Sequence, residues 1–157
     1  MKLESMYQEI ILDHYRKPHH KGLREPFDAE VHHVNPTCGD EVTLRVKLDG
    51  DVIADVSYDS LGCSISQASV SVMTDLVVGK DLAEATKAYD AFLALMRTKG
   101  DTDAVIERDE DVLEDAVAFE GVSKYPARIK CALLGWMAWK DATARAVGDD
   151  VTTEESA

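Results

Sequence analysis

The stretch EVTLRVKLDGDVIADVSYD, residues 41–59, alternates apolar and polar side chains on both sides of an Asp49-Gly50 step. A period of two is typical of a half-buried strand, and Asp-Gly is a favoured hairpin turn. We therefore predict a β-hairpin over residues 42–59, with one face on a core and the other in water. The side chains expected on the buried face are Val42, Leu44, Val46, Leu48, Val52, Ala54, Val56 and Tyr58.

A helix and a loop are expected before the hairpin. The helix must end by Pro18, because proline disfavours helical backbone in the residue that precedes it. Residues 18–37 are rich in proline and lack a clear period, which predicts a loop with a short strand near 31–34. The apolar stripe expected to dock this helix is Leu3, Met6, Tyr7, Ile10, Ile11 and Tyr15.

Helical spacing returns after the hairpin. One helix is expected between Gly62 and Gly79, and a second begins after Asp81, a suitable N-cap residue, and ends near residue 100. The acidic stretch 101–115 is expected to be a solvated surface, with a short helix around 112–117. Ser123 and Pro126 predict the start of a long final helix, since proline is tolerated in the first turn.

This order of elements predicts an α+β fold in which a small antiparallel β-sheet is covered by helices on one face. Neither an internal repeat nor a linker divides the chain, so we expect a single domain over residues 1–147. Residues 148–157 are polar and acidic and predict a flexible tail.

Charge and hydropathy narrow the possible partners. The 157-residue chain has a formal net charge of −13, which would repel nucleic-acid phosphates and anionic lipid headgroups. The first residues lack the apolar core of a signal peptide, and the longest apolar stretch, 131–139, is too short to cross a bilayer. We therefore expect a soluble cytoplasmic protein that binds neither nucleic acid nor membrane.

The chain has three cysteines, an odd number that leaves at least one unpaired in any disulfide scheme. They could be separate small apolar core residues, because free cysteine is often buried. Their surroundings favour thiolates instead. Cys38 lies in a tight loop, Cys63 lies at an expected helix start, and Cys131 follows Arg128 and Lys130.

Together with Asp40, the cysteines would supply four ligands, a set that suits tetrahedral zinc. Three thiolates and a carboxylate outweigh the charge of a divalent ion, and Arg128 and Lys130 are expected as counter-charges. The long gaps between the cysteines match no compact zinc finger. The predicted metal ligands are Cys38, Asp40, Cys63 and Cys131.

Four motifs occur together in this order: DHYRKP at 13–18, NPTCGD at 35–40, GCSIS at 62–66 and PARIKC at 126–131. In this combination the chain resembles the U-type iron–sulfur cluster assembly family, and most closely its SufU branch. The resemblance spans almost the whole expected domain. It implies a fold that gathers the three cysteines and the aspartate at one end, where a metal or a nascent cluster binds.

One position separates the branches of this family. IscU-type scaffolds carry a histidine immediately before the third cysteine, where this chain has Lys130. This departure, with the acidic insert before the last helix, points to the SufU branch. The resemblance to that branch implies bound zinc and sulfur received from a PLP-dependent cysteine desulfurase of SufS type, for delivery to downstream iron–sulfur assembly proteins.

The resulting hypothesis is a sulfurtransferase-type persulfide carrier that acts with its desulfurase rather than alone. Cys38 is the expected acceptor, because Gly39 beside it loosens the loop whereas Cys131 is held on a helix. One alternative is a scaffold on which a [2Fe–2S] cluster is assembled and then transferred. Another is a structural zinc protein with only a binding role.

Five histidines precede Cys38 and could suggest a second metal site. Adjacent residues in extended chain point to opposite sides, so neither His-His pair is well placed to chelate one ion. We expect surface or local hydrogen-bonding roles for all five and one zinc per chain. These histidines are His14, His19, His20, His32 and His33.

Overall fold

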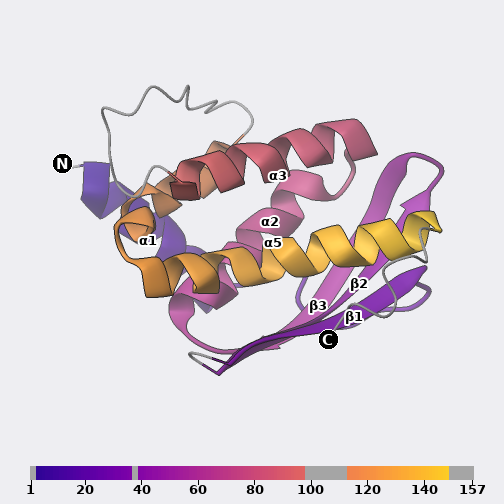
Figure 1. The fold of residues 1–157 in the computed structure, drawn as a ribbon, viewed down its shortest axis with the longest axis horizontal. Coiled ribbons are helices and arrows are strands. Elements are labelled where there is room, and N and C mark those ends of the chain that lie inside the picture. Colours follow the sequence, from indigo (N-terminus) through magenta and orange to yellow (C-terminus); the bar gives the residue numbers. More distant parts are fainter. Residues whose placement is uncertain (1–2, 37–38, 98–112, 149–157) are drawn as a thin grey trace.

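The structure is a computed structural model that describes residues 3–36, 39–97 and 113–148. Its elements follow the order of one helix, three strands and then helices (Figure 1). Cys38, most of the acidic stretch and the expected tail beyond Gly148 lie outside the described residues, so expectations about them stay predictions. Within the described part, no helix is both long and apolar enough to cross a membrane.

The sheet has three antiparallel strands in the order β1-β2-β3, where β1 is Ala29–Asn35, β2 is Asp40–Asp49 and β3 is Val52–Leu61. The short strand expected near 31–34 is thus confirmed as β1. Val42, Leu44 and Val46 of β2 are buried, while the residues between them stay half-buried. The sheet therefore has a core face and a wetter face, as the alternation predicted.

The expected core face of β3 is only partly right. Val52 and Ala54 are exposed, and Ile53 is fully buried in their place. The register shifts between Lys47 and Leu48, so the pairing changes from Lys47 with Asp55 to Leu48 with Ile53. A β-bulge of this kind inserts one residue into a strand and moves the following side chains to the opposite face.

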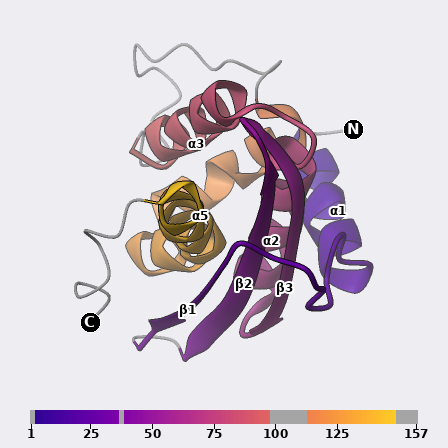
Figure 2. The same cartoon turned by 90° about the vertical axis from the view of Figure 1, so that its right-hand side faces the viewer.

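Helices cover the core face of the sheet (Figures 1 and 2). The long α5, Pro126–Val147, packs on β1 and β2, and α2, Ser64–Val77, packs on α5 and β3. The two helices approach closely at Gly135, where a Cβ atom would lie 2.7 Å from Cβ of Val70. The core between the layers includes the stacked rings of Phe92 and Trp136, with centroids 5.0 Å apart.

The remaining helices confirm most of the expected boundaries. In α3, Leu82–Arg97, the Glu84 N–H donates to Asp81 Oδ1 at 2.8 Å, which confirms Asp81 as a cap. A 3₁₀ helix, η1, spans Glu114–Lys124 where a shorter helix was expected. Ser123 does not cap α5, because its hydroxyl donates to the Glu120 carbonyl and the N-cap is Tyr125.

The first helix, α1, spans Leu3–Arg16 and packs on α2 and η1. Its buried stripe is rotated from the expected one, since Met6 and Tyr15 are 48% and 43% exposed. The most buried side chain on the described part of α1 is instead His14, which is 4% exposed. A polar residue therefore occupies the position where this helix enters the core.

Candidate metal centre

Asp40 lies at the first position of β2, at the end of the sheet where β1 also ends at Asn35. The residue is 1% exposed. Its Oδ1 accepts a hydrogen bond from the backbone N–H of Cys63 at 2.9 Å. A buried carboxylate is costly unless it is hydrogen-bonded, paired or bound to a metal, so Asp40 is suited to bind a cation at this end of the sheet.

Gly62 gives the Asp40 carboxylate its space. Its φ is +150°, a conformation that side chains rarely adopt, and a Cβ atom there would collide with Oδ1 of Asp40. The chain can therefore turn from β3 into α2 directly over Asp40 only because residue 62 has no side chain. Position 62 thus requires glycine for a steric reason that the sequence alone does not reveal.

Cys63 is the N-cap residue of α2, as its position at an expected helix start predicted. Its side chain is exposed, and Sγ lies 3.7 Å from Oδ2 of Asp40. The same carboxylate therefore contacts both the backbone and the thiol of Cys63. This double contact fixes the direction of Asp40 relative to the start of the helix.

Cys131 comes from the second turn of α5 and is 4% exposed. Its Sγ lies 3.6 Å from the carbonyl oxygen of Ala127, one turn earlier. One donor atom each from Asp40, Cys63 and Cys131 lie within 4.8 Å of one another. The structure thus brings together three of the four predicted ligands, from β2, the start of α2 and α5.

These donors fit a single divalent ion. In a tetrahedral site with Zn–S bonds of about 2.3 Å, neighbouring sulfurs are roughly 3.8 Å apart. Small side-chain movements would close the observed donor spacing to that value. Thiolates with one carboxylate suit zinc or an iron–sulfur cluster rather than magnesium or calcium, which prefer oxygen.

Cys38, the fourth predicted ligand, lies outside the described residues, and its role stays a prediction. Of the two expected counter-charges, Lys130 is exposed, and the guanidinium of Arg128 lies over the Tyr125 ring, 5.6 Å from its centroid. Their electrostatic role at the metal also stays a prediction.

Each of the five histidines contacts a carboxylate, and His14, His19, His32 and His33 also form hydrogen bonds, but the partners of His14, His19 and His33 are more than 50 residues away and not local. His32 lies 3.2 Å from Glu41, and His33 lies 2.8 Å from Asp141, a contact that crosses from β1 to α5. Burial alone would raise the pKa of Asp141, yet hydrogen bonds from His33 and Arg145 hold that pKa below its ordinary value.

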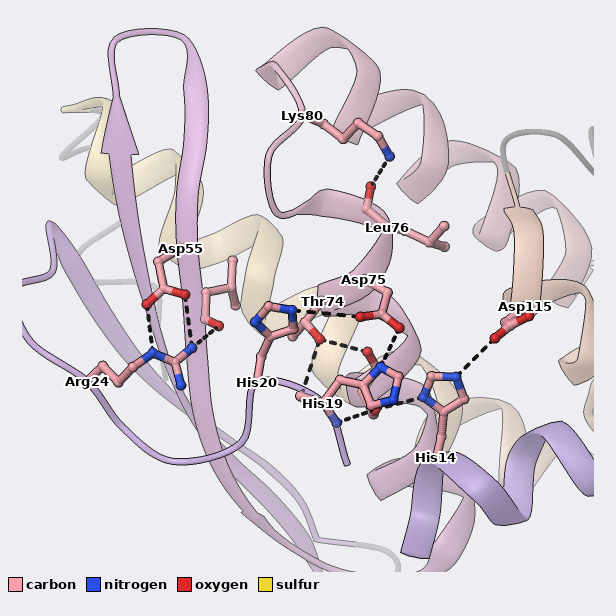
Figure 3. Close-up of polar contacts among 12 residues, drawn as sticks. His14, His19, His20, Arg24, Asp55, Thr74, Asp75, Leu76, Lys80 and Asp115 are labelled. Carbon is pink, nitrogen blue, oxygen red and sulfur yellow. Dashed lines mark hydrogen bonds and ion pairs between the residues drawn. The ribbon is translucent and has the colours of Figure 1, made fainter. Parts of the chain in front are cut away.

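His14 departs from the expected surface role because it is buried, and it forms with His19 and Asp75 a second group of potential metal ligands. Figure 3 shows these three side chains gathered between α1 and α2. Sequence reasoning missed the group because no motif links Asp75 to the two histidines. Only the packing of α1 on α2 brings them together.

The fold and the first donor group define a class of small α+β proteins that carry cysteine and aspartate side chains at one end of an antiparallel sheet. Within that class, the chain belongs to the family of the NifU-like N terminal domain, whose model matches residues 6–132. The family assignment confirms the resemblance predicted from the four sequence motifs.

Similar proteins cover nearly the whole chain. This chain is 41% identical to the zinc-dependent sulfurtransferase SufU of Bacillus subtilis over 148 residues, which are 93% of this chain and 95% of that protein. It is 37% identical to the iron–sulfur cluster assembly scaffold protein IscU of Streptococcus pyogenes, over 99% and 93% of the two chains.

A solved structure agrees with these relatives. The crystal structure of a candidate iron–sulfur cluster assembly scaffold protein for the SUF system, from Fervidobacterium islandicum, superposes with a TM-score of 0.74 at 36% identity. The match covers 90% of this chain and 98% of that one. The predicted α+β fold is thereby confirmed.

Proposed function

We propose that this protein binds zinc through Cys38, Asp40, Cys63 and Cys131 and accepts persulfide sulfur for iron–sulfur cluster assembly. The observation that carries the proposal is the convergence of Asp40, Cys63 and Cys131 at one end of the sheet. The similarity to a protein named as a zinc-dependent sulfurtransferase supports the same reading. The donor partner that we propose is a PLP-dependent cysteine desulfurase of SufS type.

Zinc at this centre would keep the cysteine ligands deprotonated at neutral pH. The ligand side chains would then have two different roles, holding the metal centre and accepting sulfur. Asp40 is oriented by the Cys63 N–H, and Cys131 is held on α5, so these residues are suited to keep the centre in place. Cys38 is the ligand that we propose to leave the centre and accept sulfur.

The transfer itself is a thiol–persulfide exchange. The Cys38 thiolate attacks the outer sulfur of the desulfurase persulfide, and a new S–S bond forms while the old S–S bond breaks. The desulfurase cysteine leaves as a thiolate, and Cys38 becomes the persulfide. No external oxidant or reductant is needed, because the sulfur oxidation states are exchanged between the two proteins.

Exposure of the other thiols ranks them as alternative acceptors. Cys63 is exposed, whereas Cys131 is 4% exposed. An incoming persulfide from a partner protein must reach the attacking sulfur. Cys63 is therefore the second candidate after Cys38, and buried Cys131 is less accessible than Cys63.

Two exposed apolar side chains, Val34 and Leu61, flank Glu41 on the strands beside the centre. Val34 pairs with Glu41, and Glu41 pairs with Leu61, so the three side chains lie side by side across the strands. Val34 and Leu61 are 51% and 65% exposed. We propose that the desulfurase contacts these two side chains when it approaches the centre.

The main rival is a scaffold for a [2Fe–2S] cluster, which the similarity to proteins named as scaffolds favours. Anaerobic purification of the untagged protein, followed by elemental analysis and absorption spectroscopy, separates the two functions. Zinc bound at the cysteine centre without visible charge-transfer bands supports the carrier. Stoichiometric iron and sulfide, with the cysteine centre free of zinc, would establish the scaffold.

A further inference from the structure

The group formed by His14, His19 and Asp75 lies away from the cysteine centre. His14 comes from the last turn of α1, His19 follows α1 closely, and Asp75 lies on the last turn of α2. Asp75 is twelve residues beyond Cys63, which is about 18 Å along a helix at 1.5 Å per residue. A ligand held here would therefore be independent of one held by the cysteines.

The donor atoms of this group are already close together. One donor from each of the three residues lies within 4.8 Å of the others. The rings of His14 and His19 have centroids 4.5 Å apart, and His19 Nδ1 lies 2.6 Å from Asp75 Oδ2. Two imidazoles and one carboxylate form a set that divalent transition metals bind readily, with further positions open to water.

Neighbouring groups hold the histidines as metal-binding histidines are usually held. His14 Nε2 lies 3.1 Å from Asp115 Oδ2, and His14 Nδ1 lies 2.8 Å from the Ser71 hydroxyl (Figure 3). If Nε2–H donates to Asp115, Nδ1 carries a lone pair that faces the Ser71 hydroxyl, and a metal would bind this lone pair in place of that hydroxyl. Asp115 would then fix the ring and raise its basicity as a ligand.

A buried tyrosine hydroxyl lies next to the group. Tyr58 is fully buried, and its hydroxyl has no hydrogen-bond partner within the described part of the chain. Burial raises the pKa of Tyr58, an interaction with the Ser71 hydroxyl opposes that rise, and the Asp75 carboxylate adds to it, so the Tyr58 hydroxyl lies beside both groups. A water bound beside the group, or on a metal held there, would give this buried hydroxyl a well-aligned hydrogen bond.

We infer that His14, His19 and Asp75 bind a divalent transition-metal ion, for which zinc is the best fit, in a second site distinct from the cysteine centre. The ion would join the end of α1 and the segment after it to α2. Tyr58 and Ser71 lie next to the group, where their hydroxyls can hydrogen-bond water that completes the coordination.

The competing explanation is a network of hydrogen bonds and ion pairs that needs no metal. Both explanations use the same contacts, so stability alone does not separate them. They differ in whether zinc binding depends on these side chains. The test must therefore count bound metal and not rely on folding or sulfur transfer.

Equilibrium dialysis against buffered free zinc, with elemental analysis, provides that count for the full-length protein. The variants are His19→Gln and Asp75→Asn, which change the two exposed members and avoid buried His14. The matched control is His32→Gln, a histidine with a similar carboxylate contact on the outer face of the sheet. Circular dichroism in chelator checks that all four proteins are folded.

The wild type and His32→Gln are expected to bind one more zinc per chain than His19→Gln and Asp75→Asn. The extra site should weaken at least tenfold in each of these variants, since even outer-shell changes cost about 10–100-fold in metal affinity. The test compares bound zinc between proteins that share the same cysteine centre. The expected difference therefore does not depend on which metal that centre carries. Equal zinc binding in all four proteins, each folded, would overturn the inference.

Discussion

The two donor groups differ in how the chain builds them. Asp40 and Cys63 lie where a strand begins and a helix begins, inside short motifs, and Cys131 needs only the first turns of α5. The second group joins His14, His19 and Asp75, and its buried histidine is supported by Asp115 from η1. Motifs at the ends of elements are visible in a sequence, whereas a group assembled by helix packing is not.

The two groups also differ in which member is buried. In the cysteine centre the carboxylate is inside, with Asp40 at 1% exposure and Cys63 exposed. In the second group the histidine is inside, with His14 at 4% exposure and the Asp75 side chain at 38%. An ionised carboxylate is more costly to bury than an imidazole, which is neutral in one protonation state, so we expect the cysteine centre to depend on a cation more strongly than the second group.

Removal of the metal should therefore lower the stability of the folded protein more than any of the substitutions below. An ion that binds only the folded state stabilises it by about 2.7 kcal/mol when its concentration is one hundred times Kd. For a chain of this size, that corresponds to a fall in Tm of roughly 5–10 °C on complete chelation. Calorimetry with metal loss verified by elemental analysis measures it, and an unchanged Tm would contradict a metal that bridges β2, α2 and α5.

Exchanging the carboxylates one at a time sharpens the comparison. Asp40→Asn should weaken zinc binding at the cysteine centre by about 10–100-fold, because it removes a charged ligand and leaves the thiols. Asp75→Asn should leave that centre unchanged. Chelator competition monitored through cobalt–thiolate absorption reports on the cysteine centre alone. Equal losses in both variants would show that the two groups are not independent.

Glycine substitutions test the steric account of Gly62. Gly62→Ala should destabilise the protein by about 1–3 kcal/mol and also weaken metal binding, because the new Cβ collides with Asp40. Gly50→Ala is the matched control, since its φ of +64° brings strain but its Cβ meets nothing within 4 Å. Urea unfolding compares the two variants, and equal metal affinity in both would refute the steric role of Gly62.

Asp141 supplies an ion pair with a histidine that lies outside both groups. Because its folded pKa is lowered, its contribution to stability is present above its unfolded pKa of about 3.9 and is lost as the pH falls through the folded value. Asp141→Asn should cost less than about 1 kcal/mol at neutral pH and progressively less as the pH falls below about 4. Unfolding measured across this pH range tests the sign, and a cost that grew in acid would contradict it.

Much of the fold was predictable because its signals are local. The hairpin turn at Asp49-Gly50, the cap at Asp81 and the proline before α5 each act within a few residues. The bulge after Lys47 was not predictable, because the alternation of Val52, Ala54 and Val56 continues without a break in the sequence. The burial of His14 was missed for a similar reason, because its partners Ser71 and Asp115 are 57 and 101 residues away.

Three of the four predicted ligands come together in the structure. Their wide separation in the sequence did not by itself guarantee this. The thiolate-favouring positions of Cys63 and Cys131 carried that prediction. The space that Gly62 leaves for Asp40 could not be read from sequence, because a Gly-Cys step is compatible with many turns.

Mapping the transferred sulfur tests the proposed function most directly. Wild type, Cys38→Ser and Cys63→Ser proteins are incubated with a SufS-type desulfurase and cysteine, and persulfides are labelled and located by peptide mass. Label on Cys38 in the wild type, and none on the protein in Cys38→Ser, is the predicted result. Normal sulfur acceptance by Cys38→Ser would contradict Cys38 as the acceptor, and its label on Cys63 would identify the exposed thiol at the start of α2 as the acceptor instead.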